Sequence, residues 1–243
     1  AAEVLAAYGI MAYVFSDVHP VPMLSFAVRC LKTVAGIMVT ASHNPKQYNG
    51  YKVYGEDGAQ MNPEDTAKVL GFIEKHTDYL AAPAPTEEQK KKFKRTVPSS
   101  VDRKYYKALT KLTLSKEAVK KCGKNLKLVY TPVHGSGYIP VTTILKKIGI
   151  NATVVPEQTK KDTDFSTVEV PNPEFKETLS MGIALAEEIG ATVVFGTDPD
   201  SDRLGVAVKG KDGEFTALSG NQVGILLLDY ILTRLKEDGK LPA

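Results

Sequence analysis

Short apolar runs that alternate with helical patterns are the feature that most limits how this chain can fold. The runs "AGIMVTA" (residues 35–41), "NLKLVYT" (125–131) and "ATVVFGT" (191–197) have the length of buried strands and are too short for helices. Helical patterns separate them, such as residues 138–149 and 172–190, where Gly149 and Gly190 are expected to act as C-caps. The alternation predicts an α/β fold with two consecutive α/β domains, whose mixed, mostly parallel sheets are flanked by helices.

Interruptions of this alternation predict the domain boundaries. Residues 80–100 hold three prolines and the basic run "KKKFKR", which we interpret as a solvated segment near a boundary. We expect a first domain over residues 1–100, a second over 101–211, and the start of a third over 212–243. Because the chain begins inside a helical pattern without an initiator Met, we expect a fragment whose first domain is truncated at its N-terminus.

Local turn signals divide the first domain further. Asn49-Gly50 is a strong hairpin-turn signal. Residues 51–61 are interpreted as two short strands around Asp57-Gly58. Asn62 followed by Pro63 and two acids predicts a helix with an asparagine cap.

Composition excludes several classes of function. Lys+Arg 31 against Asp+Glu 28 gives a net charge of only +3, so no nucleic-acid partner is expected. No apolar run approaches the roughly 18 residues of a membrane span, so no membrane partner is expected either. Cys30 and Cys122 lack metal-like spacing and suit a reducing compartment, which favours the cytoplasm. The sequence leaves the oligomeric state open.

Three carboxylates follow an apolar strand in "TDPDSDR" (residues 197–203). Asp198, Asp200 and Asp202 alternate along the chain, so an extended backbone places them on one face. Two like charges 4 Å apart repel by about 4 kcal/mol at an effective dielectric constant near 20. A divalent cation with oxygen ligands would offset this repulsion, and ligands gather at the carboxyl ends of strands in α/β sheets.

The spacing also narrows the choice of metal. An EF-hand loop needs glycine at its sixth position and glutamate at its twelfth, where this chain has Arg203 and Lys209. Mg²⁺ commonly leaves coordination positions to water or phosphate oxygens. We therefore predict a Mg²⁺ site formed by the three aspartates and a phosphate group.

A serine loop offers that phosphate. In "MVTASHNPKQYNGYKVY", Ser42 follows a strand and is flanked by His43 and Asn44. A phosphoryl group on Ser42 would supply an oxygen ligand to the metal. Lys52 could transfer a proton if its pKa were lowered, and Arg203 could bind phosphate oxygens through two hydrogen bonds. The stretch "HGSGY" could present backbone N–H groups to an anion, so His134 and Gly135, with Asn44, are predicted to bind substrate.

These motifs resemble one family along essentially the whole chain. "TASHNPKQYNGYKVY" together with "GTDPDSDRLGVAV" resembles the α-D-phosphohexomutases, the phosphoglucomutase/phosphomannomutase family. "YTPVHGSG", "PNPE" and "LSGNQVGILLLDYIL" are similar to the branch with bacterial phosphoglucomutases and phosphopentomutases. The resemblance implies four domains, of which the sugar-reading loop of the third and the phosphate-binding loop of the fourth would be absent here.

The resemblance also implies a role for each site residue. Ser42 resembles the serine that carries the phosphoryl group, and it completes the Mg²⁺ ligand set of Asp198, Asp200 and Asp202. Lys52 resembles a general acid–base, and Arg203 resembles the arginine beside the phosphoserine. His43 belongs to the same motif as a further catalytic candidate.

The expected activity is a phosphosugar mutase that interconverts hexose 1-phosphate and hexose 6-phosphate through a phosphoserine and a bisphosphate intermediate. Glucose phosphates are the first expectation for this small-molecule substrate, and mannose and pentose phosphates are alternatives. A second alternative is a haloacid-dehalogenase-like phosphatase with Asp198 as nucleophile. A third is a non-catalytic module that binds a metal or a sugar phosphate, and we expect these 243 residues alone to show little or no turnover.

Overall fold

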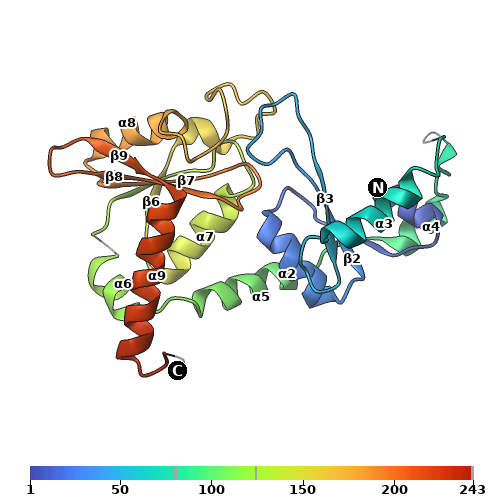
Figure 1. The fold of residues 1–243 in the computed structure, drawn as a ribbon, viewed down its shortest axis with the longest axis horizontal. Helices are drawn as coiled ribbons and strands as arrows, with labels where there is room; N and C mark the ends of the chain where they lie inside the picture. Colours follow the sequence, from blue (N-terminus) through green and yellow to red (C-terminus); the bar gives the residue numbers. More distant parts are fainter. Residues whose placement is uncertain (79–80, 124, 242–243) are drawn as a thin grey trace. The chain divides into compact units, whose positions relative to one another are not determined.

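The structure, a computed structural model, describes residues 1–78, 81–123 and 125–241 (Figure 1). It contains two compact units that interleave along the chain. The first unit comprises Ala1–Val18, Leu24–Ile37 and Val53–Lys104, and the second comprises His19–Met23, Met38–Lys52 and Tyr105–Ala243. Both units combine helices with β-sheet, so the predicted α/β class is confirmed. The boundaries predicted at residues 100 and 211 stay predictions.

The N-terminal half combines helices with strands of three to five residues. In chain order they are α1 (Ala2–Ala7), β1 (Ala12–Val14), α2 (Val21–Leu31), β2 (Ala35–Val39), β3 (Tyr51–Gly55), α3 (Pro63–Ile73), α4 (Glu87–Phe93), β4 (Lys94–Thr96) and α5 (Ser99–Thr110). Strand β1 pairs in parallel with β4, and β2 pairs with β3. The ends of β2 and β3 that flank the serine loop belong to the second unit.

Residues 81–100 contain more regular structure than the sequence analysis expected. Thr86 caps α4 through a capping box with Gln89, so this helix begins in spite of the nearby prolines. The basic run then ends α4 and forms β4, whose residues Lys94 and Arg95 pair with Ala12 and Tyr13. The side chains of β4 remain exposed, as expected for a solvated segment.

The local signals around the serine loop had mixed outcomes. The Asn62 cap is confirmed, because its side chain accepts a hydrogen bond from Asp65 N. The prediction of a tight hairpin turn at Asn49-Gly50 was wrong, because neither residue has the positive φ that a type I′ turn needs. Gly50 is required for space instead, since a Cβ there would lie 2.3 Å from Thr40 O. The second predicted strand is reduced to a single bridge between Tyr54 and Gln60.

The second unit is built on a five-stranded sheet. Its remaining elements are α6 (Lys116–Cys122), β5 (Leu128–Thr131), α7 (Tyr138–Ile148), β6 (Ala152–Val154), the 3₁₀ turns Pro156–Thr159 and Glu177–Leu179, α8 (Ser180–Ile189), β7 (Val193–Thr197), β8 (Leu204–Lys209), β9 (Phe215–Leu218) and α9 (Gly220–Glu237). The strand order is β6-β5-β7-β8-β9. Strands β6, β5 and β7 are parallel, and β8 and β9 continue the sheet in antiparallel pairs.

Helices cover both faces of this sheet because the chain reverses direction across it. The β5–α7–β6 connection moves toward one edge, and the β6–α8–β7 connection moves back past β5. Right-handed crossovers then place α7 and α8 on opposite faces, as Figure 1 shows. The core below α8 is apolar and includes Val129, Leu179, Ala186, Val194 and Phe215.

Glycine ends both crossover helices as predicted. Gly149 and Gly190 adopt left-handed conformations directly after α7 and α8. Helix α8 begins at Ser180, later than the pattern from residue 172 predicted, because the "PNPE" segment forms turns. Among the described residues, no helix is long and apolar enough to cross a membrane.

Candidate functional site

Two loops leave the same edge of the sheet side by side. Strands β5 and β7 are parallel neighbours, with Thr131 opposite Gly196 near their carboxyl ends. The segment that follows β5 contains the "HGSG" motif, and the segment that follows β7 is the aspartate loop, defined as residues 198–202. From β5 the chain continues to β6 on one side and then returns to β7 on the other side, so the strand order reverses at β5. Open α/β sheets bind ligands at such a switch point.

The aspartate loop concentrates buried negative charge. The side chains of Asp198 and Asp200 are buried, and Asp202 is exposed. One carboxylate oxygen of each lies within 4.8 Å of the others. Burial raises the pKa of Asp198 to about 7, and the neighbouring Asp200 carboxylate contributes to this rise, against the backbone hydrogen bond from Arg203. The loop therefore favours either a proton or a cation among its carboxylates.

The serine loop, defined as residues 40–50, meets the aspartate loop inside the second unit. Ser42 Oγ donates a hydrogen bond to Asp198 Oδ2 at 3.3 Å and lies 3.2 Å from His43 Nδ1. Ser42 has a φ of 54°, a left-handed conformation that non-glycine residues rarely adopt. A serine hydroxyl thus lies beside the most buried carboxylate, with an imidazole on its other side.

Thr40 is a contact that the sequence analysis missed. Its Oγ1 accepts a hydrogen bond from Ser42 N at 2.8 Å and donates one to Asp200 Oδ2 at 3.1 Å. One hydroxyl therefore fixes the backbone of the serine loop and orients a carboxylate of the aspartate loop. The sequence did contain a signal for this contact, because a hydroxyl residue at the end of a strand and two positions before Ser42 can hydrogen-bond the Ser42 backbone.

Lys52 supplies the positive charge of the site. Its Nζ lies 3.0 Å from Asp200 Oδ2 and 3.2 Å from Asp202 Oδ2. Burial favours a lower pKa for Lys52, but the hydrogen bonds and charges of Asp200 and Asp202 outweigh it and raise the pKa. Proton transfer by Lys52 was predicted on the condition that its pKa is lowered. In the structure the shift has the opposite direction, so Lys52 is a cation held by two carboxylates.

The residues present fit a hard divalent cation. Asp200 Oδ1 is buried and has no hydrogen-bond partner among the described residues. An acceptor buried in this way is costly unless another group satisfies it. The Lys52 ammonium already acts as a cation between two of the carboxylates. An all-oxygen set with one unsatisfied buried atom is the donor chemistry that Mg²⁺ or Ca²⁺ prefers.

Arg203 and Asn44 are anchored near the site in other ways. The Arg203 backbone N–H donates to Asp198 Oδ1 at 3.0 Å, while its guanidinium forms an ion pair with Glu174 at 3.7 Å. Glu174 comes from the "PNPE" segment and was not predicted as a site residue. Asn44 N donates to Ala41 O at 3.1 Å, which closes the turn that contains Ser42.

His134 and Gly135 make internal contacts. His134 Nδ1 donates to Lys160 O at 2.8 Å, because a carbonyl can only accept, and Nε2 lies 2.8 Å from Thr167 Oγ1. The backbone N–H groups of His134 and Gly135 donate to Gln158 O and Pro132 O. The geometry therefore does not support anion binding by these amides, and a substrate-binding role for the two residues stays a prediction.

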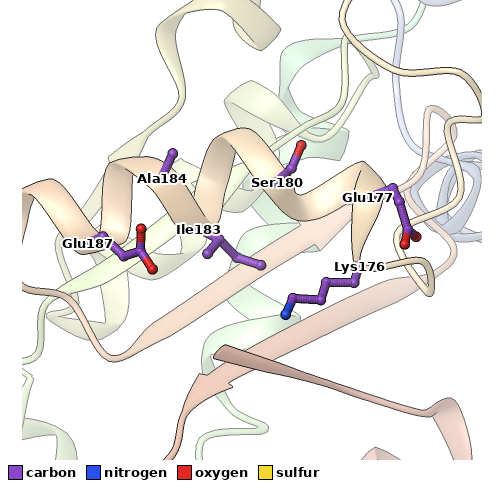
Figure 2. A pocket seen from close by; sticks show the side chains of 6 residues that line it. All are labelled: Lys176, Glu177, Ser180, Ile183, Ala184 and Glu187. Carbon is purple, nitrogen blue, oxygen red and sulfur yellow. The ribbon is translucent and has the colours of Figure 1, made fainter. Parts of the chain in front are cut away.

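A separate hollow of about 340 Å³ lies beside α8. Figure 2 shows that α8 supplies most of its lining, with Ile183 and Ala184 between polar side chains. None of the predicted site residues lines it.

Family models match most of the chain. The model for phosphoglucomutase/phosphomannomutase α/β/α domain I matches residues 1–80, and the model for α/β/α domain II matches residues 103–213.

Two relatives with similar sequences are named phosphoglucomutases. The chain is 40% identical to a phosphoglucomutase of Staphylococcus epidermidis over 246 aligned positions, which cover 99% of this chain and 43% of that protein. It is 39% identical to a phosphoglucomutase of Staphylococcus aureus, covering 94% of this chain and 41% of that protein.

Solved structures share the fold. A crystal structure of a candidate phosphomannomutase from Thermus thermophilus matches with a TM-score of 0.69 and 28% identity, over 87% of this chain and 44% of that one. A family protein from Burkholderia thailandensis matches with a TM-score of 0.62 over 87% of this chain and 42% of that one, and its 24% identity supports the fold alone. The chain thus spans less than half the length of these relatives.

Proposed function

The chain belongs to the phosphoglucomutase/phosphomannomutase family, and on that premise we propose that it carries the phosphoryl-transfer site of a phosphosugar mutase. The proposed reaction interconverts hexose 1-phosphate and hexose 6-phosphate, with glucose phosphates as the first pair to test because the Staphylococcus relatives are named phosphoglucomutases. Mannose and pentose phosphates are the alternative substrates. Since the chain spans 43% of the S. epidermidis relative, turnover is proposed for a longer protein that includes these residues.

The observation that carries this proposal is the contact between Ser42 and the aspartate loop. The Ser42 hydroxyl lies 3.3 Å from Asp198 Oδ2, and Lys52 lies 3.0 Å from Asp200 Oδ2. A serine that only formed a turn would not need buried carboxylates beside its hydroxyl, so this contact supports a chemical role for Ser42. As a phosphoryl carrier it would place phosphate oxygens next to a group of cation ligands.

The transfer step follows from this arrangement. A hydroxyl oxygen of the sugar phosphate attacks the phosphorus carried by Ser42. A new P–O bond to the sugar forms as the P–O bond to Ser42 breaks, which gives a sugar bisphosphate and a free serine. The sugar hydroxyl loses its proton to a base, for which we propose Lys52 in its neutral amine form, after it has left the aspartates that hold it as a cation and has released its proton to solvent. A proton returns to Ser42 Oγ from His43, whose Nδ1 lies 3.2 Å away. The bisphosphate then returns its other phosphoryl group to Ser42 by the reverse step.

We propose Mg²⁺ as the cofactor, held by Asp198, Asp200, Asp202 and a phosphoryl oxygen on Ser42. Its chemistry there would be to offset negative charge on the transferring phosphoryl group. Asp200 Oδ1, which has no hydrogen-bond partner in the described part of the chain, supports this assignment. Arg203 would bind the same phosphoryl group after leaving Glu174, and Asn44 would contact the substrate.

The free thiols of Cys30 and Cys122 support a reducing compartment, and we propose the cytoplasm.

Phosphosite mapping tests the function directly. The chain is incubated with glucose 1,6-bisphosphate and Mg²⁺, and its intact mass and modified residue are determined. We expect one acid-stable phosphoryl group on Ser42, and none in Ser42→Ala. The matched control Ser180→Ala removes an exposed hydroxyl of α8 and should be modified like the wild type. Acid-labile phosphate on Asp198 would refute the mutase mechanism and favour the phosphatase alternative.

A further inference from the structure

The segment of residues 134–137 lies against the aspartate loop, and this contact has no role in the function proposed so far. The segment joins β5 to α7, and the aspartate loop follows β7, the neighbouring strand. Parallel pairing from Leu128 to Thr131 brings the two strand ends together. The contact is therefore a direct result of the sheet topology.

Ser136 makes the central contact with two donors. Its backbone N–H donates to Pro199 O at 2.8 Å, and its Oγ donates to the same oxygen at 2.9 Å. Ser136 is only 8% exposed, so water competes little for these bonds. A carbonyl oxygen has two lone pairs, and one serine thus satisfies both acceptor positions of Pro199.

Glycines on both sides of Ser136 make this approach possible. A Cβ on Gly135 would lie 2.4 Å from Pro199 Cα and 2.6 Å from Pro199 O. A Cβ on Gly137 would lie 2.6 Å from Thr197 Oγ1 and 2.7 Å from Ser201 Oγ. Larger side chains would force the two loops apart, so the sequence Gly-Ser-Gly fits the backbone of the aspartate loop closely.

Hydrogen bonds to residues outside the aspartate loop hold the segment of residues 134–137 in place. His134 N donates to Gln158 O at 2.9 Å, and Gln158 Nε2 donates to Thr167 Oγ1 at 2.9 Å. Thr167 also lies within 2.8 Å of His134 Nε2. This network is largely buried, so its hydrogen bonds keep the backbone next to Ser136 in a fixed position relative to Pro199.

The aspartate loop needs such support. Pro199 stands between Asp198 and Asp200, so the orientation of its peptide sets how the two carboxylates face each other. Repulsion among the carboxylates favours opening of the loop. Ser201 has a φ of 56°, a left-handed conformation that costs about 1–2 kcal/mol in a non-glycine residue.

We propose that Ser136 is a positioning residue of the metal site, which holds the Pro199 carbonyl and thereby keeps Asp198 and Asp200 at the spacing that a divalent cation requires. This inference rests on the proposed function, because it assumes that the aspartates bind a cation. In this proposal Ser136 stays bound to Pro199 O and is not itself a ligand of the cation. It acts on affinity through the geometry of the ligands.

The test measures binding of Mn²⁺, a spectroscopically visible substitute for Mg²⁺, to the 243-residue chain by electron paramagnetic resonance. Ser136→Ala keeps the backbone donor and loses the side-chain donor. Mutations of groups that orient metal ligands lower affinity by about 10- to 100-fold, and with one donor retained we expect the lower end of that range. Ser136→Cys should lie between alanine and wild type, because a thiol is a weaker donor. Ser180→Ala is the matched control and should bind as the wild type does.

Unfolding midpoints measured with and without Mn²⁺ separate positioning from a purely structural role. A structural role would lower both midpoints of Ser136→Ala equally and leave the Mn²⁺ dissociation constant unchanged, and that result would overturn the inference. Failure of the wild type itself to bind Mn²⁺ would overturn the proposed metal site and this inference with it. A weaker affinity in Ser136→Ala, with a normal far-UV circular dichroism spectrum, would support the positioning role.

Discussion

Replacing Asp198 with asparagine should stabilise the second unit at alkaline pH while weakening its affinity for cations. The asparagine has nearly the same size as aspartate, and its Oδ1 can still accept the hydrogen bond from Arg203 N. Its amide can donate to Ser42 Oγ, which now donates to Asp198 Oδ2. The substitution therefore removes a buried charge and keeps the hydrogen bonds.

The size of the effect follows from the pKa of Asp198. Burial and the neighbouring Asp200 raise this pKa from 3.8 to about 7. The difference of about three units corresponds to about 4 kcal/mol, at 1.36 kcal/mol per unit. Because the folded state has the higher pKa, it holds the proton more tightly than the unfolded state. Wild-type stability from this group is complete below about pH 4 and is lost as the pH rises through about 7.

Urea unfolding in EDTA, followed by circular dichroism, would measure the difference. At about pH 8 the free energy of unfolding of Asp198→Asn should exceed that of the wild type by up to about 4 kcal/mol, and the gap should close toward about pH 4. Asp229→Asn, which removes an exposed carboxylate of α9, should change little. Added Mg²⁺ should stabilise the wild type more than Asp198→Asn. Equal or lower stability of Asp198→Asn at alkaline pH would refute the argument that Asp198 carries a destabilising charge.

Two further substitutions test the packing and charge of the site. Lys52→Met should tighten Mn²⁺ binding, measured by calorimetry, because it removes the ammonium 3.0 Å from Asp200 Oδ2, and weaker binding would contradict competition between Lys52 and the cation. Gly135→Ala should lower the free energy of unfolding by about 1–3 kcal/mol, because its Cβ would overlap Pro199. Gly71→Ala, in α3, should instead raise it by about 0.5–1 kcal/mol, because no atom of the described residues beyond its chain neighbours and its own helix backbone lies within 4 Å of the new Cβ. A loss of stability in both variants would contradict this reasoning.

The sequence predicted those parts of the fold that depend on local signals. The Asn62 cap and the glycine C-caps of α7 and α8 are encoded within a few residues, and all three are present. Strand β4 was missed because it exists through pairing with β1, which lies far earlier in the chain. The Asn49-Gly50 signal misled because Gly50 serves close packing against Thr40 O rather than a tight turn.

The candidate site shows the same division. Placing Ser42 and the aspartates at strand ends was enough to predict that they could meet. The identity of the connecting residues was hidden, because Thr40, Ser136 and Glu174 act through contacts between distant segments. The direction of the Lys52 pKa shift also depended on which carboxylates lie within hydrogen-bond distance, which no spacing in the sequence reveals.

The ion pairs of Lys52 with Asp200 and Asp202 bear on how such a protein matures in the cell. A cluster of acids that depended on a metal for neutralisation would fold only after the ion arrived. Here Lys52 supplies that counter-charge, so under the proposed metal site a newly synthesised chain would complete this unit first and bind its cation later, in exchange for the ammonium.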